Sequence, residues 1–71
     1  MNERENIRYR LMTNHLSSAW LINMLGERGI ETDRATMSAA LAGTRKGPKV
    51  DDILSESVKI LDWYEEITAN G

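Results

Sequence analysis

Hydrophobic positions recur at helical spacing in four separate segments of the chain. In the first segment Ile7 and Leu11 lie one turn apart, and in the second the pair 20–21 (Trp-Leu) is followed four residues later by the pair 24–25 (Met-Leu). This spacing is typical of helices that bury one face against a core. No run shows the alternation of period two that marks a half-buried strand. The pattern therefore predicts an all-α fold of four or five helices.

The third and fourth segments differ from an ordinary surface helix. Between Arg34 and Ala42 the only large apolar side chains are Met37 and Leu41, and the remaining ones are Ala, Ser or Thr. Such short side chains let another molecule approach the helix backbone closely. In the fourth segment the apolar positions cover about half of the circumference, because each residue advances by about 100°. They are Val50, Ile53, Leu54, Val58, Ile60, Leu61, Tyr64 and Ile67. One packing face needs less than that, so a second apolar surface is expected on this helix.

Capping residues and glycines indicate where these helices begin and end. Ser17 or Ser18 is expected to cap the second helix and Asp33 the third, since their side-chain oxygens accept hydrogen bonds from free N–H groups at a helix start. Gly29 and Gly43 suit the left-handed residue that follows a helix. The expected helices cover residues 3–14, 18–28, 34–42 and 48–67, within one domain spanning residues 1–71.

Composition excludes several kinds of site. The 71 residues include no cysteine and one histidine, His15. Disulfides, thiolate metal sites and thiol nucleophiles are therefore excluded, and we expect no metal and no cofactor. His15 is too close in sequence to Ser17 and Ser18 to form a nucleophile–base pair on rigid elements. The stretch 43–49 lacks the Gly-Lys-Ser/Thr of a phosphate-binding loop. We expect the protein not to be an enzyme.

The location follows from the absence of long apolar stretches. The longest uncharged segment, residues 11–26, contains polar residues throughout and is not expected to cross a bilayer. The N-terminus lacks the basic and then apolar order of a signal peptide. We expect a cytoplasmic protein without a membrane partner.

Charge is distributed unevenly along the chain, whose formal net charge is −2. Residues 50–71 contain six acidic side chains against Lys59 alone, whereas residues 34–49 contain four basic side chains and no acidic one. The four are Arg34, Arg45, Lys46 and Lys49. A local field of this kind matters more for a charged partner than the total does. The basic segment is a candidate contact for phosphates.

The stretch 33–48 resembles the recognition helix and the following loop of lambda-repressor/Cro-like (XRE-type) helix-turn-helix domains. The matching positions are Thr36, Met37, Ser38, Ala40, Gly43, Arg45, Lys46 and Pro48. The chain is also similar in size to small phage or mobile-element regulators, although its turn 29–33 is longer than in compact members of the family. The resemblance implies a lambda-repressor-like helix-turn-helix domain.

The resemblance also implies roles for individual residues. The third helix would enter the major groove, and its Arg34 would bond O6 and N7 of guanine. The implied base-reading residues are Arg34, Ala35, Thr36, Ser38 and Ala39. Cations near the end of that helix and hydroxyls at the start of the second would hold the phosphates, which position the protein without specifying sequence. The implied phosphate-binding residues are Ser17, Ser18, Thr44, Arg45, Lys46 and Lys49.

The expected function is therefore sequence-specific binding of double-stranded DNA by a small transcriptional regulator, a repressor that occupies its operator as a homodimer. The surplus apolar surface of the last helix would form the dimer interface, through Ile60, Trp63, Tyr64 and Ile67. The chain has no room for a ligand-sensing domain, so no small-molecule ligand is expected. The expected location is the nucleoid in the cytoplasm of a bacterium, with the protein encoded by the bacterium or a phage. The alternative is a protein–protein interaction or dimerisation module that uses the same apolar surface and does not bind DNA.

Overall fold

The computed structural model describes residues 2–69, which form four α-helices and no strand. The helices are α1 (Glu3–Thr13), α2 (Ser18–Glu27), α3 (Arg34–Ala42) and α4 (Pro48–Ala69). The prediction of an all-α fold is confirmed. The expected bounds hold for α3, whereas α1 and α2 each end one residue earlier than expected and α4 continues two residues further.

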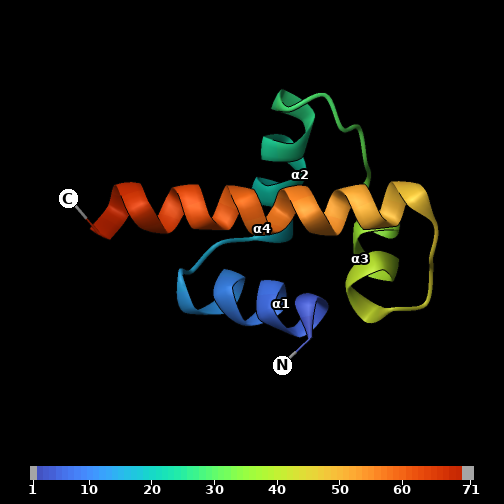
Figure 1. The fold of residues 1–71 in the computed structure, drawn as a ribbon, viewed down its shortest axis with the longest axis horizontal. Helices are drawn as coiled ribbons and strands as arrows, with labels where there is room; N and C mark the ends of the chain where they lie inside the picture. The colour runs from blue at the N-terminus through green and yellow to red at the C-terminus, as the bar shows by residue number, and fades with distance from the viewer. Residues whose placement is uncertain (1, 70–71) are drawn as a thin grey trace.

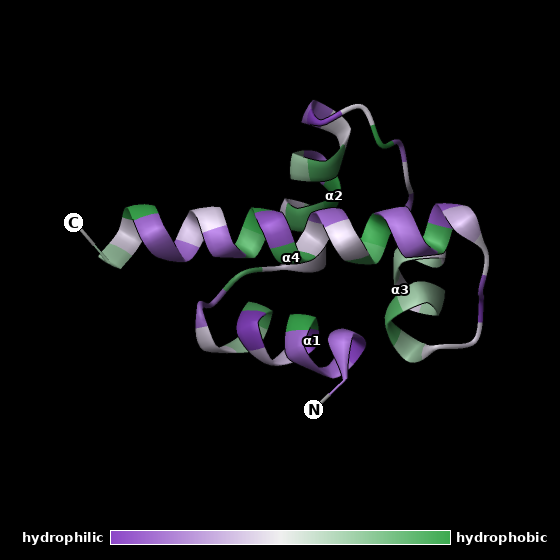
Figure 2. Cartoon of the chain, in the orientation of Figure 1, coloured by the Kyte–Doolittle hydropathy of each residue, from purple (hydrophilic) through white to green (hydrophobic). Residues whose placement is uncertain are grey.

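Helix α4 is the element on which the other three pack. Its 22 residues extend over about 33 Å at 1.5 Å per residue, close to the longest dimension of the molecule, 36 Å. Figure 1 shows α4 crossing the whole fold, with α1 and α3 beside each other on one side of it. In Figure 2 hydrophobic and hydrophilic segments alternate along α4, as expected of a helix with one buried face.

The core takes residues from all four helices. The buried hydrophobic side chains are Ile7, Leu11, Leu21, Leu25, Met37, Ala40, Leu41, Val50, Ile53, Leu54, Ile60 and Leu61. Ser57 is also fully buried, and its hydroxyl donates to the carbonyl of Ile53, 2.6 Å away, so the polar group in the core is satisfied. Helices α2 and α3 are both anchored by these contacts, which fixes the surface that they present together.

The first three helices begin at side-chain caps. The side chains of Asn2, Ser17 and Asp33 accept hydrogen bonds from the backbone N–H three residues later, at 2.8, 3.1 and 2.7 Å respectively. Of the two serines considered for α2, it is Ser17 that caps the helix. These bonds satisfy N–H groups that have no partner inside the helix.

The same three helices also end alike. A residue with positive φ follows each, and the N–H of the next residue returns to a carbonyl in the last turn. This is the Schellman arrangement. The residue is Gly29 after α2 and Gly43 after α3, as expected, but after α1 it is His15, with φ of 58°. A left-handed conformation costs a residue with a Cβ about 1–2 kcal/mol, so α1 ends under strain.

Replacing His15 by Gly is expected to raise the free energy of unfolding by about 0.5–1 kcal/mol, because the relief of backbone strain exceeds the entropy that Gly adds to the unfolded chain. His15→Ala is the matched control, since it removes the imidazole but keeps the Cβ. Urea unfolding of the three proteins measures the effect. Equal stability of the Gly and Ala variants would contradict the prediction, because the strain relieved would then be no larger than the entropy that Gly adds to the unfolded chain.

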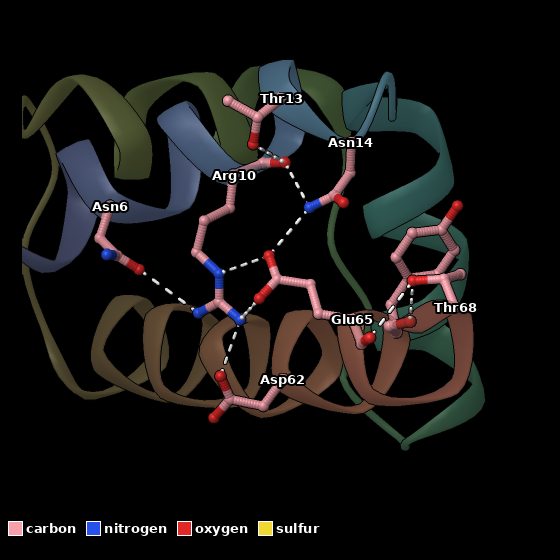
Figure 3. Close-up of polar contacts among 8 residues, drawn as sticks. Asn6, Arg10, Thr13, Asn14, Asp62, Glu65 and Thr68 are labelled. Carbon is pink, nitrogen blue, oxygen red and sulfur yellow. Dashed lines mark hydrogen bonds and ion pairs between the residues drawn. The ribbon is translucent and has the colours of Figure 1, made fainter. Parts of the chain in front are cut away.

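A cluster of charged side chains joins α1 to the C-terminal half of α4 (Figure 3). The guanidinium of Arg10 donates to both carboxylate oxygens of Glu65, at 2.9 and 2.8 Å, and to Asp62 at 2.7 Å. The side-chain amide of Asn14 donates to the same Glu65 carboxylate at 2.9 Å. The Arg10 side chain is only 14% exposed, which favours this fork-shaped contact over a loose surface pair. Two of the acidic residues of α4 are therefore partly neutralised by α1.

This cluster predicts a loss of stability in acid. Hydrogen bonds from Arg10 hold the pKa of Glu65 below its ordinary range. A carboxyl group with a lowered pKa in the folded state stabilises the fold above its unfolded pKa and loses that contribution as the pH falls through the folded value. We expect the free energy of unfolding to fall below about pH 4.5, and to fall less in Arg10→Gln. Urea titrations between about pH 3 and pH 7 test this, and parallel curves for the two proteins would contradict it.

Candidate nucleic-acid interface

Helix α3 presents a surface of short side chains to solvent. Met37, Ala40 and Leu41 point into the core, whereas Ala35, Ser38 and Ala42 are exposed and Ala39 and Thr36 are half-buried. The exposed positions lie on the side of the helix opposite its three core residues, as the helical period requires. No side chain longer than Ser occupies the centre of this surface, so another molecule can approach the α3 backbone closely.

One edge of this surface borders a hollow of about 540 Å³ between α1, the start of α2 and α3. Arg34 and Ser38 line it from α3, Ser17 and Ser18 from α2, and Arg8 from α1; Leu11, Met12, Leu16, Ala19, Leu41 and Ala42 complete the lining. Within residues 2–69, Arg8 and Arg34 form no hydrogen bond or ion pair. Two cations without counter-ions therefore face the same open hollow.

Arg8 is not among the residues that the sequence predicts to contact DNA. Its only signal in the sequence is the i, i+4 spacing with Arg4, which is ordinary for a solvated helix face. Arg4 also lies beside α3, since a Cβ added to Gly43 would be 3.0 Å from its Nε. Helix α1 thus brings two arginines to the α3 side of the molecule, which only the packing of α1 against α3 reveals.

The other edge of the α3 surface is formed by the loop that follows the helix. The hydroxyl of Thr44 donates to the carbonyl of Ala39 at 3.4 Å, and Arg45 Nη1 donates to Thr36 Oγ1 at 3.0 Å. The loop thus folds back along the helix. Lys46 and Lys49 are both exposed, and Lys49 lines a second hollow together with Glu31 and Asp52. Of the residues expected to contact phosphates, Thr44 and Arg45 therefore have side chains that are already engaged with α3.

Asp33 is an acidic residue within this basic region. Its carboxylate accepts the Thr36 N–H at 2.7 Å, and this bond, followed by one from the Thr36 hydroxyl, lowers its pKa; the positive charges of Arg45 and Lys49 act in the same direction. The carboxylate is therefore occupied in capping α3. The favourable interaction with these cations reduces the repulsion that it would otherwise exert on a phosphate.

The expected dimer interface needs correction. Ile60 is fully buried in the core of the single chain, so its side chain is not available to a second chain. Tyr64 is half-buried and makes an edge-to-face contact with Trp20 of α2, with ring centroids 5.2 Å apart. Trp63 and Ile67 remain at the surface, 43% and 48% exposed. Ile60 lies near the edge of the apolar face of α4. Whether a residue at that edge is buried in the single chain depends on where α2 packs, which the spacing of apolar residues in α4 does not show.

Within residues 2–69 no three or more His, Asp or Glu side chains are grouped so that they could hold a metal ion. In the same part of the chain no helix is long and apolar enough to cross a bilayer.

Comparison with known proteins gives no relative. No family model, curated protein sequence or solved structure matches the chain.

Proposed function

We propose that this protein binds double-stranded DNA through α3 and acts as a small transcriptional regulator of the lambda-repressor-like helix-turn-helix type. The observation that supports this is the position of the α3 surface between two cationic edges. Arg8 and Arg34 border it on one side, and the Arg45 guanidinium lies against Thr36 on the other, followed in the chain by the exposed Lys46 and Lys49. A major groove, about 12 Å wide, admits an α-helix and is bordered by a phosphate backbone on each side.

Short side chains and flanking cations have separate roles in this proposal. Ala35 and Ala39 allow close approach and offer apolar contact to a thymine methyl group, while Arg34 and Ser38 supply hydrogen bonds to base edges. The flanking cations bind phosphates and fix the position of the helix without reading sequence. Ser17 and Ser18 line the hollow beside Arg8 and Arg34. One of the two phosphate backbones that border the major groove would pass along this hollow.

We further propose that regulation is steric and that two copies bind adjacent half-sites. Trp63 and Ile67, each about half exposed, offer the apolar contact for a second copy. A stable interface buries about 800 Å² per partner, far more than two half-exposed side chains supply. The dimer would therefore form on the DNA, where half-sites about 34 Å apart bring two copies together. Such a regulator would act as a repressor in the cytoplasm, by occupying its operator.

The exposure of Trp63 and Ile67 also favours a second candidate function, docking to a different protein without DNA binding. In that case Trp63→Ala abolishes partner binding, and Arg34→Ala leaves it unchanged.

A salt-titrated binding assay combined with selection from random duplexes tests the main proposal. We expect retention at about 50 mM salt that falls steeply as salt is added, and enrichment of an inverted repeat. Arg34→Ala should lose the enriched sequence, whereas Arg28→Ala should keep it, because Arg28 pairs with Glu56 of α4, 3.2 Å away, and does not line the hollow. No retention at about 50 mM salt, where non-specific binding is strong, would exclude DNA as the partner.

A further inference from the structure

Arg45 lies in the loop after the C-terminus of α3, but its side chain extends back to the N-terminal turn of the same helix. Arg45 follows the C-terminus of α3, yet its Nη1 lies 3.0 Å from Oγ1 of Thr36, near the N-terminus of that helix. The loop is held in this direction by Thr44, whose N–H and hydroxyl both donate to the carbonyl of Ala39, at 3.1 and 3.4 Å. The guanidinium is thus placed beside the first turn of α3.

Thr36 is itself held by its neighbour in that turn. Its N–H donates to the Asp33 carboxylate at 2.7 Å, and the positive charge of Arg45 stabilises the same carboxylate. Asp33, Thr36 and Arg45 therefore form one connected group. A guanidinium has five N–H donors, and Arg45 uses one on Thr36 and makes no other hydrogen bond within residues 2–69. The remaining donors are free for a ligand.

We propose that Arg45 reads a base edge rather than a phosphate, and that Thr36 is the residue that positions it. This inference rests on the proposed DNA binding through α3. The first turn of a recognition helix is the part that faces base edges, and Arg34 already occupies it. Arg45 brings a second guanidinium to the same turn. Its flat fork matches O6 and N7 of guanine, which a lysine ammonium cannot contact in the same way.

The roles of two residues therefore change from those expected by resemblance. Arg45, expected to bind a phosphate, is assigned to a base edge. Thr36, expected to read a base, is assigned the role of positioning Arg45. Lys46 and Lys49 are exposed and, among residues 2–69, donate no hydrogen bond to α3, so they keep the phosphate role expected for them.

Base-preference profiles of matched variants distinguish these roles. The wild type, Arg45→Lys, Arg45→Ala, Thr36→Val, Thr36→Ser and Lys46→Ala are each used to select duplexes from one random library, and their affinities are measured against salt. Arg45→Lys should lose about tenfold preference for guanine at one position of the site while retaining affinity for random duplex. Thr36→Val should lose preference at that same position, and Thr36→Ser, which keeps the hydroxyl, should retain it. Lys46→Ala should weaken all sequences alike and reduce the log–log salt slope by about 1.

Circular dichroism and thermal unfolding show whether each variant is folded. If Thr36→Val does not fold, Thr36→Ser and Arg45→Lys still test the proposal. If Arg45→Lys keeps every base preference, or Arg45→Ala behaves like Lys46→Ala, Arg45 is a phosphate contact and the inference is wrong while DNA binding stands. If the wild type binds no duplex, the proposed function fails and the inference with it.

Discussion

Replacing Ile60 by Ala is expected to lower the free energy of unfolding by about 2–5 kcal/mol. Ile60 is fully buried, and truncation leaves a cavity in addition to removing apolar contacts. A domain of 71 residues is stabilised by roughly 4–11 kcal/mol in total. This one substitution therefore removes a large share of the stability, and partial unfolding near 37 °C is expected.

The chain offers a matched control in the same helix. Ile67 lies two turns after Ile60 and is 48% exposed, so Ile67→Ala should change the free energy of unfolding by no more than about 0.5 kcal/mol. Its effect should instead appear in self-association on DNA, measured by sedimentation of the protein with a duplex carrying two half-sites. Urea unfolding of both variants measures stability. Equal and small losses would mean that Ile60 is not in the core of the single chain.

Replacing Arg8 by Ala is expected to weaken binding to duplex DNA by roughly 1.5–3 kcal/mol, which is tenfold or more. Arg8 faces the hollow between α1 and α3 without a counter-ion among residues 2–69, and Arg34 lines the same hollow. A cation that contacts a phosphate displaces about one counter-ion from the DNA. Its loss should therefore reduce the log–log salt slope by about 1 for each bound copy.

Fluorescence anisotropy of a labelled duplex over a range of salt concentrations measures both quantities. Arg28→Ala is the control, because it removes the same kind of side chain where α2 faces Glu56 of α4. Its affinity and slope should equal those of the wild type. If the log–log salt slope of Arg8→Ala equals that of the wild type, Arg8 does not contact a phosphate. The role of α3 is tested separately, by Arg34→Ala.

Most of the local structure could be predicted from the residues of each segment. Asp33 caps α3, Gly29 and Gly43 follow α2 and α3 with positive φ, and the bounds of α3 were predicted to the residue. These features depend on interactions within a few positions of the chain, where the type of each residue limits the backbone conformation directly. The short side chains of α3 were evident in the same way.

The surroundings of the α1 arginines depend on how the helices pack and could not be predicted from local sequence. Arg8 and Arg10 are two positions apart in one helix, yet Arg8 lines the hollow beside α3 while Arg10 bonds Glu65, which is 55 positions away in the chain. The tertiary structure also decided that Ile60 is buried and Trp63 exposed. Helical periodicity gives the direction in which a side chain points, but the identity of the neighbouring helix on that side depends on how all four helices pack together. That packing is fixed by contacts between residues far apart in sequence, which local pattern does not contain.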